Sequence, residues 1–410
     1  MSVHTGNLEE VYQKKTDKEH VLDNPDTYTG SMDIVDIETF VYDEKENKIV
    51  NKKLNDVIMG LYKLFDEGIV NCRDHCVRME QAMKLCQSNI IPLSYIDVSI
   101  SDDGMITFIN DGNGIDIVEH PVHKIWIPEM IFYHLRTGTN YNKSEKKIVG
   151  GKNGFGSKLI FIWSEWGLIE TVDHIRGLKY IQECSNNLDV KNKPIITKYK
   201  GKPYTKISFK PDYKRLKLNS GLTPGMLSLF KRRVYDIAAV TDKKIKVKWN
   251  SEQLSVKHFQ QYVDMYIGNK SDTKRIYESF DDRWEYAVCL SPNGEFQQVS
   301  FVNGIFTSKG GKHVDHVLNQ VINKIKAYIL KKKKIEVKST SIKEQLMLFL
   351  RCDIENPAFD SQTKDFMNTN INKFGSKCEP SDSFCEKIAK LGVMDTACDL
   401  TAVKTKKDVS

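Results

Sequence analysis

The segment GGKNGFGSKLIFIW, residues 150–163, joins a glycine-rich loop to an apolar helix. Its glycines let successive backbone N–H groups turn toward an anion, and the N-terminus of the following helix adds donors and a favourable dipole. Lys158 falls in the first helical turn, within reach of phosphate oxygens. The spacing is neither G-x-x-x-x-G-K-[ST] nor G-x-G-x-x-G. The segment predicts a phosphate-binding loop of another type, and a flexible surface loop is the alternative.

A second glycine pair lies in the segment Asn110-Asp111-Gly112-Asn113-Gly114, which follows an expected β-hairpin over residues 95–110. Asp and Asn beside glycine are common turn chemistry, so the segment alone is weak evidence for a site. Its significance depends on the polar side chains of the preceding helix.

That helix, expected over residues 54–79, carries polar residues at helical spacing beside its apolar face. The row consists of Glu67, Asn71, Asp74 and Arg78. A solvated helix face is the usual explanation for such a row. A general base, a metal ligand and a phosphate contact that face one pocket would produce the same pattern.

The chain has 410 residues, enough for two domains of ordinary size. Hydrophobic residues make up 40% and charged residues 28%, which excludes a mostly disordered chain. No stretch approaches the roughly 18 apolar residues of a membrane span. Nine scattered cysteines indicate reduced thiols in an intracellular protein rather than a disulfide framework.

Hydrophobic periodicity predicts an α/β sandwich up to about residue 255 and a second α+β unit after it. Strands are expected at residues 95–101, 105–110, 167–173, 178–183, 195–199, 205–209, 244–249, 286–291, 297–301 and 345–354. Helices are expected at residues 54–79, 125–135, 159–163, 222–240, 314–330 and 382–406.

Charge is unevenly distributed along the chain. Residues 1–50 hold 12 acidic residues against 5 lysines, whereas residues 301–350 hold 10 lysines against 3 acidic residues. The basic excess centres on Lys331, Lys332, Lys333 and Lys334, at the end of an expected helix. Such a cluster favours a polyanionic partner, and a solvated helix end is the alternative.

Taken together, three segments resemble the ATP-site motifs of the GHKL superfamily, which includes type II topoisomerases, heat-shock protein 90 chaperones, MutL-type repair proteins and histidine kinases. They are Phe65-Asp66-Glu67-x-x-x-Asn71, Asn110-Asp111-Gly112-x-Gly114 and residues 151–158. Five further segments narrow the resemblance to eukaryotic-type DNA topoisomerase II: residues 26–31, 137–141, 300–304, 307–315 and 356–364. They occur in the same order as in the family and over nearly the whole chain. The residues of these motifs are most similar to those of a viral member.

The resemblance implies an α+β fold with a particular division of the chain. An N-terminal arm is expected at residues 1–20 and a GHKL-type α/β sandwich ATPase domain at 21–255. An α+β transducer domain, similar to a ribosomal protein, is expected at 256–385, and the first part of a C-terminal linker helix at 386–410. ATP and Mg²⁺ are the implied cofactors.

The resemblance also implies roles for single residues. Glu67 would be the general base, Asn71 the ligand of Mg²⁺, and Asp111 the acceptor of the adenine amino hydrogen. From the transducer, Gln362 and Lys364 would reach the γ-phosphate and act in catalysis. Further implied ATP-binding residues are Arg78, Asn110, Gly112, Gly114, Gly138, Thr139, Asn140, Gly151, Lys152, Asn153, Gly154, Phe155, Gly156, Ser157, Lys158, Thr205 and Thr363.

The chain departs from the family pattern just after Asn71. Cys72, Arg73 and His75 stand where relatives commonly have small residues and an asparagine, which puts in doubt how closely the phosphate-side contacts copy the family. Cys72, His75 and Cys76 also suggest a zinc site. Because no fourth ligand lies nearby in the sequence, we do not expect zinc there.

The implied partners are double-stranded DNA, contacted by the lysines at 331–334, and a second copy of the chain bound through the ATPase domains. No membrane partner is expected. No D-x-D metal site of the family's cleavage machinery occurs, so the resemblance implies the ATPase portion of a larger enzyme whose cleavage core lies downstream. The expected location is the host cytoplasm, at viral replication sites, for a viral protein and the nucleus otherwise.

Two other functions fit part of the pattern. A MutL-type or other GHKL ATPase that acts as a nucleotide-gated DNA clamp shares the first three motifs. A clamp that binds ATP without turnover is a non-enzymatic alternative, but such a clamp has no need of a general base at position 67.

Overall fold

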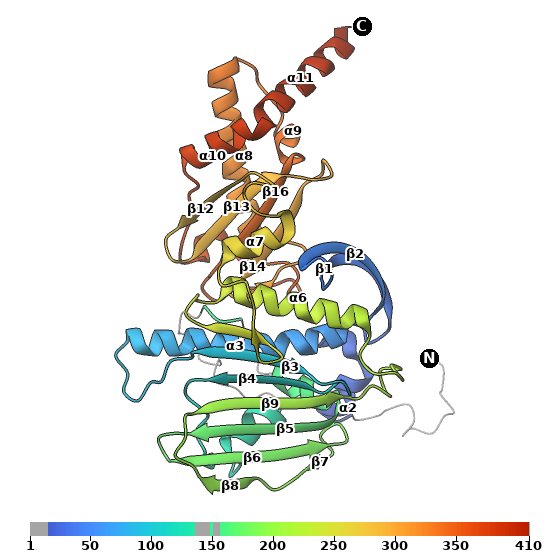
Figure 1. Ribbon diagram of the computed structural model, residues 1–410, viewed down its shortest axis with the longest axis vertical. Helices are drawn as coiled ribbons and strands as arrows, with labels where there is room; N and C mark the ends of the chain where they lie inside the picture. Colours follow the sequence, from blue (N-terminus) through green and yellow to red (C-terminus); the bar gives the residue numbers. More distant parts are fainter. Residues whose placement is uncertain (1–14, 136–147, 151–155, 410) are drawn as a thin grey trace, which may run out of the picture.

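The computed structural model describes residues 15–135, 148–150 and 156–409 (Figure 1). A nine-stranded sheet fills the lower half of that view and a five-stranded sheet the upper half. Two long helices, α3 (Met59–Lys84) and α6 (Pro224–Val240), lie between the two sheets. The mixed α+β class expected from the sequence is confirmed.

The nine-stranded sheet has the order β11-β10-β3-β4-β9-β5-β6-β7, with β8 paired to β6. Only β10 and β3 pair in parallel among these strands. The strands are β3 (Tyr95–Ile100), β4 (Ile106–Asp111), β5 (Ser164–Asp173), β6 (Leu178–Ser185), β7 (Val190–Lys191), β8 (Ile195–Lys198), β9 (Tyr204–Pro211), β10 (Lys246–Trp249) and β11 (Glu252–Gln253). The expected hairpin over residues 95–110 and the four strands expected between residues 167 and 209 are present.

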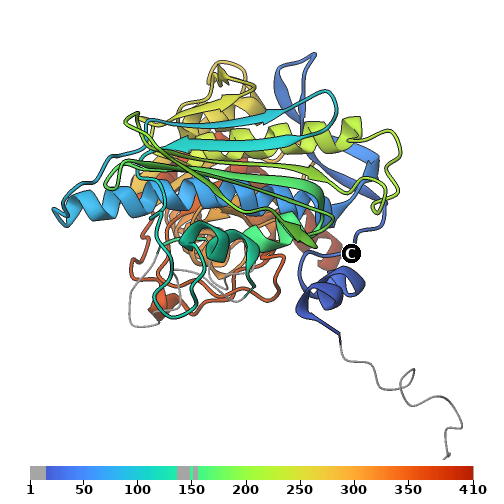
Figure 2. The same ribbon diagram turned by 90° about the horizontal axis from the view of Figure 1, so that it is seen from below.

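Helix α3 runs along the strands from one end of this sheet to the other (Figures 1 and 2). Its Phe65 is fully buried, with its ring centroid 4.1 Å from that of Phe230 in α6 and 5.2 Å from that of Phe108 in β4. Burying one such side chain contributes about 1.5–3 kcal/mol. Because Phe65 is clamped between the sheet and α6, the rotation of α3 about its axis is fixed. The shorter helices α4 (Ile127–Tyr133) and α5 (Gly156–Ile162) complete this layer.

The predicted start of α3 was wrong. The helix begins at Met59, because Leu54 and Val57 belong to β2 (Lys48–Val57). Strand β2 pairs with β1 (Val35–Asp43) in a separate two-stranded ribbon. Before it come α2 (Asp17–Asp23) and η1 (Pro25–Thr27). The apolar residues at positions 54, 57 and 58 fit the spacing of a helix, and that coincidence extended the predicted helix backwards.

The five-stranded sheet has the order β12-β13-β16-β14-β15 and follows α7 (Phe259–Ile267) in the chain. Its strands are β12 (Arg275–Phe280), β13 (Trp284–Leu290), β14 (Gln297–Val302), β15 (Ile305–Phe306) and β16 (Leu346–Cys352). Its helices are α8 (Lys312–Lys333), α9 (Ser339–Lys343), η2 (Ile371–Lys373), α10 (Asp382–Ile388), η3 (Ala389–Val393) and α11 (Met394–Val409). Gly392 in η3 has a φ of 115°, so the backbone is kinked there. The domain limits at residues 20, 255 and 385 stay predictions. Within the described ranges, no helix has both the length and the apolar character to cross a membrane.

Candidate nucleotide site

Glu67 lies in the first half of α3 with 6% of its surface exposed. Its Oε1 atom is 3.2 Å from the Nζ atom of Lys63, one turn earlier on α3, and 3.4 Å from the Nζ atom of Lys364. Burial raises the pKa of the Glu67 carboxyl, whereas the charges of Lys364 and Lys63 lower it, and the pKa ends below its usual value. Glu67 is therefore a buried carboxylate that stays ionised.

The other carboxylate oxygen of Glu67 faces the first residue of α5. A Cβ atom placed on Gly156 would lie 2.0 Å from Oε2 of Glu67, far inside van der Waals contact. Only glycine allows the chain to pass so close to this carboxylate. The end of the glycine-rich segment is thus fitted directly against the expected base.

Lys364 reaches Glu67 from the second sheet's side of the molecule. It lies in the loop after β16, has a φ of 62° and is 7% exposed. Its Nζ atom is also 3.4 Å from the carbonyl oxygen of Gly150. In the same loop the Thr363 hydroxyl donates to Asp365, and Gln362 is half-buried. Sequence positions 67, 150 and 364 therefore meet at one place.

A buried charge cluster surrounds Lys63. This lysine is 3.1 Å from Oδ2 of Asp66, and the Nε atom of Arg233 in α6 donates to Oδ1 of Asp66 at 2.6 Å. Arg233 also donates from Nη2 to the Gly304 carbonyl, 2.7 Å away, in the turn between β14 and β15. Burial raises the pKa of Asp66, but the charges of Arg233 and Lys63 outweigh it and lower the pKa strongly. The expected base thus stands beside a fully ionised network that extends to the second sheet.

Lys63 and Arg233 were not predicted as site residues. The spacing of four residues between Lys63 and Glu67 is the local signal by which this ion pair could have been found. Arg233 had no such signal, because its partner Asp66 is 167 residues away.

On the adenine side of the predicted site, Asn110 and Asp111 end β4. Asn110 is 5% exposed and pairs across the sheet with Thr205 of β9. The hydroxyl of Thr205 lies 2.9 Å from that of Thr171 on β5. Asp111 uses Oδ1 to accept from the backbone N–H groups of Ser94 and Tyr95, and Oδ2 to accept from the Ser94 hydroxyl. The Asp111 carboxylate therefore holds the start of β3.

The remaining polar residues of α3 line up as expected from their spacing. Asp74 is 1% exposed and accepts from the Gly150 N–H at 2.8 Å, so it anchors the beginning of the glycine-rich segment. Asn71 and Arg78 are half-buried one turn to either side. Within the described part of the chain, the side-chain amide of Asn71 has no hydrogen-bond partner. Its oxygen is of the type that Mg²⁺ prefers.

Helix α5 carries two further predicted residues. Ser157 donates to the Ile131 carbonyl at 3.3 Å, and Lys158 is 2% exposed. Burial lowers the pKa of the Lys158 ammonium to about 8. Gly112 and Gly114 lie in the loop after β4. The predicted contacts at Gly138, Thr139, Asn140, Gly151, Lys152, Asn153, Gly154 and Phe155 lie outside the described residues.

The residues after Asn71 that depart from the family are buried or half-buried. His75 places Nε2 2.7 Å from the Asn113 carbonyl oxygen, and burial raises the pKa of Cys72 and of Cys76 to about 12. No group of three or more His, Cys, Asp or Glu side chains suited to a metal occurs among the described residues. Cys72 and Cys76 are buried, protonated thiols.

Arg73 joins the two halves of the molecule. It is 4% exposed and donates from Nη2 to Oδ1 of Asp353, just after β16, at 2.8 Å. The Asn303–Gly304 turn lies across it, with φ values of 50° and 78°, and a Cβ atom on Gly304 would lie 2.8 Å from Cδ of Arg73. Asn-Gly suits a turn with two positive φ values. The extra arginine therefore contacts the second sheet's unit, in this structure, through Asp353 and Gly304.

Replacing Arg73 by methionine is expected to lower the free energy of unfolding by about 3 kcal/mol, because it leaves Asp353 without its buried partner. This value is at the lower end of the cost of breaking a buried ion pair, because Arg351 remains 3.4 Å from Asp353. Urea unfolding followed by tryptophan fluorescence measures it. The control is Arg283→Met, which removes a half-exposed pair with Glu355 and should cost under about 1 kcal/mol. Equal costs for both variants would refute the link.

Lys331, Lys332, Lys333 and Lys334 lie away from all these residues. The first three form the last turn of α8, and Lys334 ends it with a φ of 58°. All four are exposed, and Lys333 has a loose ion pair with Asp395 at 3.9 Å. Figure 1 shows α8 in the upper half of the molecule, whereas α3 belongs to the lower half.

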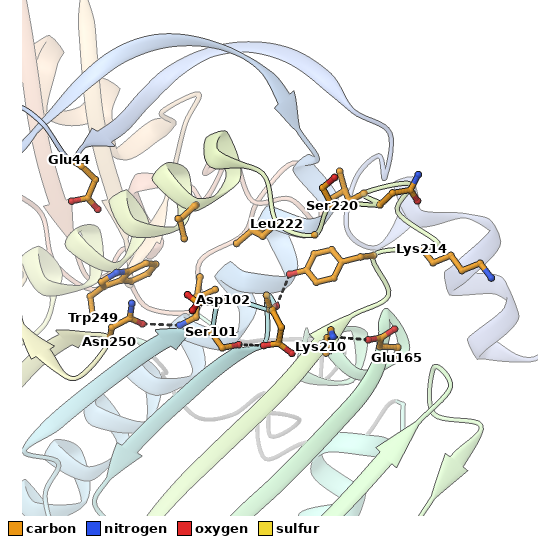
Figure 3. Close-up of a pocket in the computed structure, with 18 residues that line it drawn as sticks. Glu44, Ser101, Asp102, Glu165, Lys210, Lys214, Ser220, Leu222, Trp249 and Asn250 are labelled. Atoms are coloured by element: carbon orange, nitrogen blue, oxygen red, sulfur yellow. Dashed lines mark hydrogen bonds and ion pairs between the residues drawn. The ribbon is translucent and has the colours of Figure 1, made fainter.

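A separate surface cleft of about 770 Å³ lies at the turn between β3 and β4 (Figure 3). Three of its charged groups are paired with one another: Lys210 is 3.4 Å from Asp103 and 3.5 Å from Glu165. The Tyr213 hydroxyl donates to the Gly104 carbonyl at 2.7 Å. None of the predicted site residues lines this cleft, so it is distinct from the candidate nucleotide site.

Comparisons with known proteins agree with this arrangement. Residues 258–390 match the family model described as DNA gyrase B. The chain is 42% identical over 98% of its length to DNA topoisomerase 2 of Arabidopsis thaliana, and 41% identical over 95% to that of Acanthamoeba polyphaga mimivirus. It spans 27% and 30% of the length of these two relatives.

Two crystal structures match the chain over nearly their entire length. The ATPase region of Saccharomyces cerevisiae topoisomerase II is 39% identical, with a TM-score of 0.88 over 97% of this chain and 100% of the other. The ATPase and transducer domains of DNA topoisomerase II from Balamuthia mandrillaris are 37% identical, with a TM-score of 0.90 over 98% and 100%. The chain therefore belongs to the ATPase regions of type II DNA topoisomerases.

Proposed function

We propose that the chain hydrolyses ATP and serves as the nucleotide-operated gate of a type II DNA topoisomerase. The contact between Lys364 and Glu67 is the observation that supports it most directly. It joins an ionised carboxylate on α3 to a cation from the loop after β16. A general base for phosphoryl transfer needs such a carboxylate, and a cation there can stabilise charge on the transferring group.

In the proposed reaction, Glu67 accepts a proton from the water that attacks the γ-phosphorus, and the bond to the bridging oxygen breaks to release ADP and phosphate. Two lysines hold Oε1 of Glu67, so we assign proton transfer to Oε2, which faces Gly156. Lys364 then contacts the γ-phosphate, with Gln362 and Thr363 beside it. This couples the second unit to the presence of that phosphate.

Asn71 would hold Mg²⁺ through its amide oxygen, and its position one turn after Glu67 fits that role. The ion, when bound, neutralises charge on the β- and γ-phosphates. Lys158 and Arg78 add positive charge on the phosphate side. Gly112, Gly114, Ser157 and the predicted residues outside the described ranges complete the proposed site.

For the adenine, we propose Asn110 in place of Asp111 as the main contact. Both Asp111 oxygens already accept hydrogen bonds from Ser94 or Tyr95. Asn110 is the buried residue of the pair, and its neighbour across the sheet is Thr205. The amide oxygen of Asn110 can accept a hydrogen bond from the adenine amino group.

The whole enzyme would pass one DNA duplex through a break made by a cleavage core downstream of this chain, with two copies of the chain closing around the transported duplex. A MutL-type clamp is not favoured, because the relatives and solved structures above are topoisomerases over almost the whole chain. Relaxation of supercoiled plasmid by a longer protein that contains this chain tests the topoisomerase assignment.

Dimerisation is expected to depend on nucleotide. Closure around ATP pairs two copies, so the dimer fraction should rise with a non-hydrolysable ATP analogue and with protein concentration. Light scattering across micromolar protein, with and without the analogue, measures this. ADP serves as the control, since it lacks the γ-phosphate that Lys364 would contact. A monomer that persists at saturating analogue would contradict the gate.

The lysines at 331–334 are proposed to contact the DNA backbone. Capping the end of α8 needs one or two cations, and here four are exposed in succession. Replacing all four by alanine should weaken duplex binding and reduce the salt slope by up to about one unit per lost phosphate contact, with basal ATP hydrolysis unchanged. Salt-dependent DNA binding measures it, and the exposed pair Lys243→Ala/Lys244→Ala is the control. An unchanged affinity and slope would leave the lysines as a solvated helix end.

We also propose that the chain comes from a virus, African swine fever virus, because of the residues found in its motifs. The relatives do not single it out, because the plant and mimivirus proteins are similar to the same degree. A viral source implies action at replication sites in the host cytoplasm, and any other source implies the nucleus. Imaging of the tagged protein in its own cells distinguishes the two.

A further inference from the structure

Two lysines share one oxygen of the expected base, and they come from different parts of the molecule. Lys63 lies one turn before Glu67 on the same helix, with Nζ 3.2 Å from Oε1. Lys364 comes from the loop after β16, with Nζ 3.4 Å from Oε1. The contact of Lys63 depends only on the geometry of α3. The contact of Lys364 depends on how the two units are placed and is lost when Lys364 turns to a phosphate.

Lys63 is itself held in place. Its Nζ atom is 3.1 Å from Asp66 Oδ2, while Arg233 occupies Oδ1 of Asp66 at 2.6 Å. Arg233 continues to the Gly304 carbonyl at 2.7 Å. The side chains of Lys63, Asp66 and Arg233 are each at most 8% exposed. The ammonium therefore cannot turn to solvent and remains against both carboxylates.

The balance of charges around Glu67 makes Lys63 the cation that stays in contact with it. The charged groups that face Glu67 among the described residues are Lys63 and Asp66 on α3 and Lys364, and Arg233 acts through Asp66. When Lys364 leaves for the γ-phosphate, Lys63 remains beside Glu67 and Asp66, while Arg233 is shared between Asp66 and Asp236, 3.6 Å away. Arg233 is committed to Asp66 and Gly304, so Lys63 is then the cation in contact with Glu67.

We propose that Lys63 is a positioning residue for hydrolysis: it keeps Glu67 ionised and holds Oε1, so that Oε2 faces the attacking water. This rests on the proposed function, in which Glu67 is the base. A purely structural role for Lys63 would be to neutralise Asp66. That role is less favoured, because Arg233 already bonds the Asp66 carboxylate at 2.6 Å, whereas Lys63 lies 3.1 Å from it.

The test compares Lys63→Met, Lys63→Arg and the control Lys84→Met, an exposed lysine on the same helix. In Lys63→Met, kcat should fall about 10- to 100-fold, part of what a general base contributes, with ADP affinity within about threefold of the parent. Without the Lys63 charge, burial raises the pKa of Glu67, so the acid limb of the kcat–pH profile should move to higher pH. Lys63→Arg should return the limb to the parent position, and Lys84→Met should match the parent throughout.

Each outcome decides the question. A folded Lys63→Met variant with the parent's kcat and acid limb overturns the proposal. So does a loss of kcat with an unmoved limb that Lys63→Arg does not restore. If thermal melting shows that Lys63→Met does not fold, Lys63→Gln replaces it, and failure of both makes the lysine structural. Glu67→Gln separates the two hypotheses: an inactive Glu67→Gln beside a normal Lys63→Met refutes only this inference, whereas an active Glu67→Gln refutes the base itself.

Discussion

Replacing Glu67 by glutamine is expected to reduce ATP hydrolysis by about 10²–10⁴-fold while nucleotide still binds, because the amide has nearly the shape of the carboxylate but cannot accept the proton of the attacking water. The neighbourhood should tolerate the change. Glutamine keeps an oxygen toward Lys63 and Lys364 and adds no bulk against Gly156, where the space is tightest. Phosphate release and binding of a fluorescent ADP measure the two effects separately.

Glu80→Gln is the matched control for this experiment. Glu80 lies on α3 beyond the site, half-buried, and accepts a weak contact from Cys76. The Glu80→Gln substitution removes the same charge from the same helix as Glu67→Gln, and it should leave kcat within about twofold of the parent. If Glu67→Gln hydrolysed ATP as fast as Glu80→Gln, Glu67 would be only one member of a polar helix face.

Most elements with a strong period could be predicted from the sequence, and those without one could not. The hairpin of β3 and β4 was expected because apolar runs flank a clear turn at residues 101–104. The ribbon of β1 and β2 was missed, since several of its residues are exposed on both faces and its burial does not alternate cleanly. Helix α7 and strand β12 were missed where the pattern restarts after residue 255.

The candidate site was predictable where chemistry is local and not where it depends on the fold. The row from Glu67 to Arg78 follows from helical spacing alone. Only the resemblance to a family implied that Lys364 reaches the γ-phosphate, and its contact with Glu67, 297 residues away, was not predicted. The pairs of Arg73 with Asp353 and of Arg233 with Asp66 had no sequence signal, since helical or strand periodicity says nothing about contacts between distant segments.

Replacing Lys364 by alanine is expected to reduce hydrolysis by about 10²-fold or more, as removal of one preorganised charge at a transition state does. Binding of a non-hydrolysable ATP analogue should weaken, whereas ADP should bind as to the parent, because the lysine is proposed to contact only the γ-phosphate. The exposed Lys373→Ala, in η2 of the same unit, is the control and should change none of these quantities.

The contacts of Lys364 in this structure sharpen that expectation. Its Nζ atom is 3.4 Å from both Glu67 Oε1 and the Gly150 carbonyl, and distances at the limit of hydrogen bonding are readily exchanged for a phosphate. Lys63 remains on Glu67 in the variant, so the base keeps one of the two cations whose charges lower its pKa. Equal losses of ADP and analogue binding would instead mean that Lys364 supports the packing between the two units. If the protein detects the γ-phosphate through Lys364, the variant must lose affinity for the ATP analogue but not for ADP.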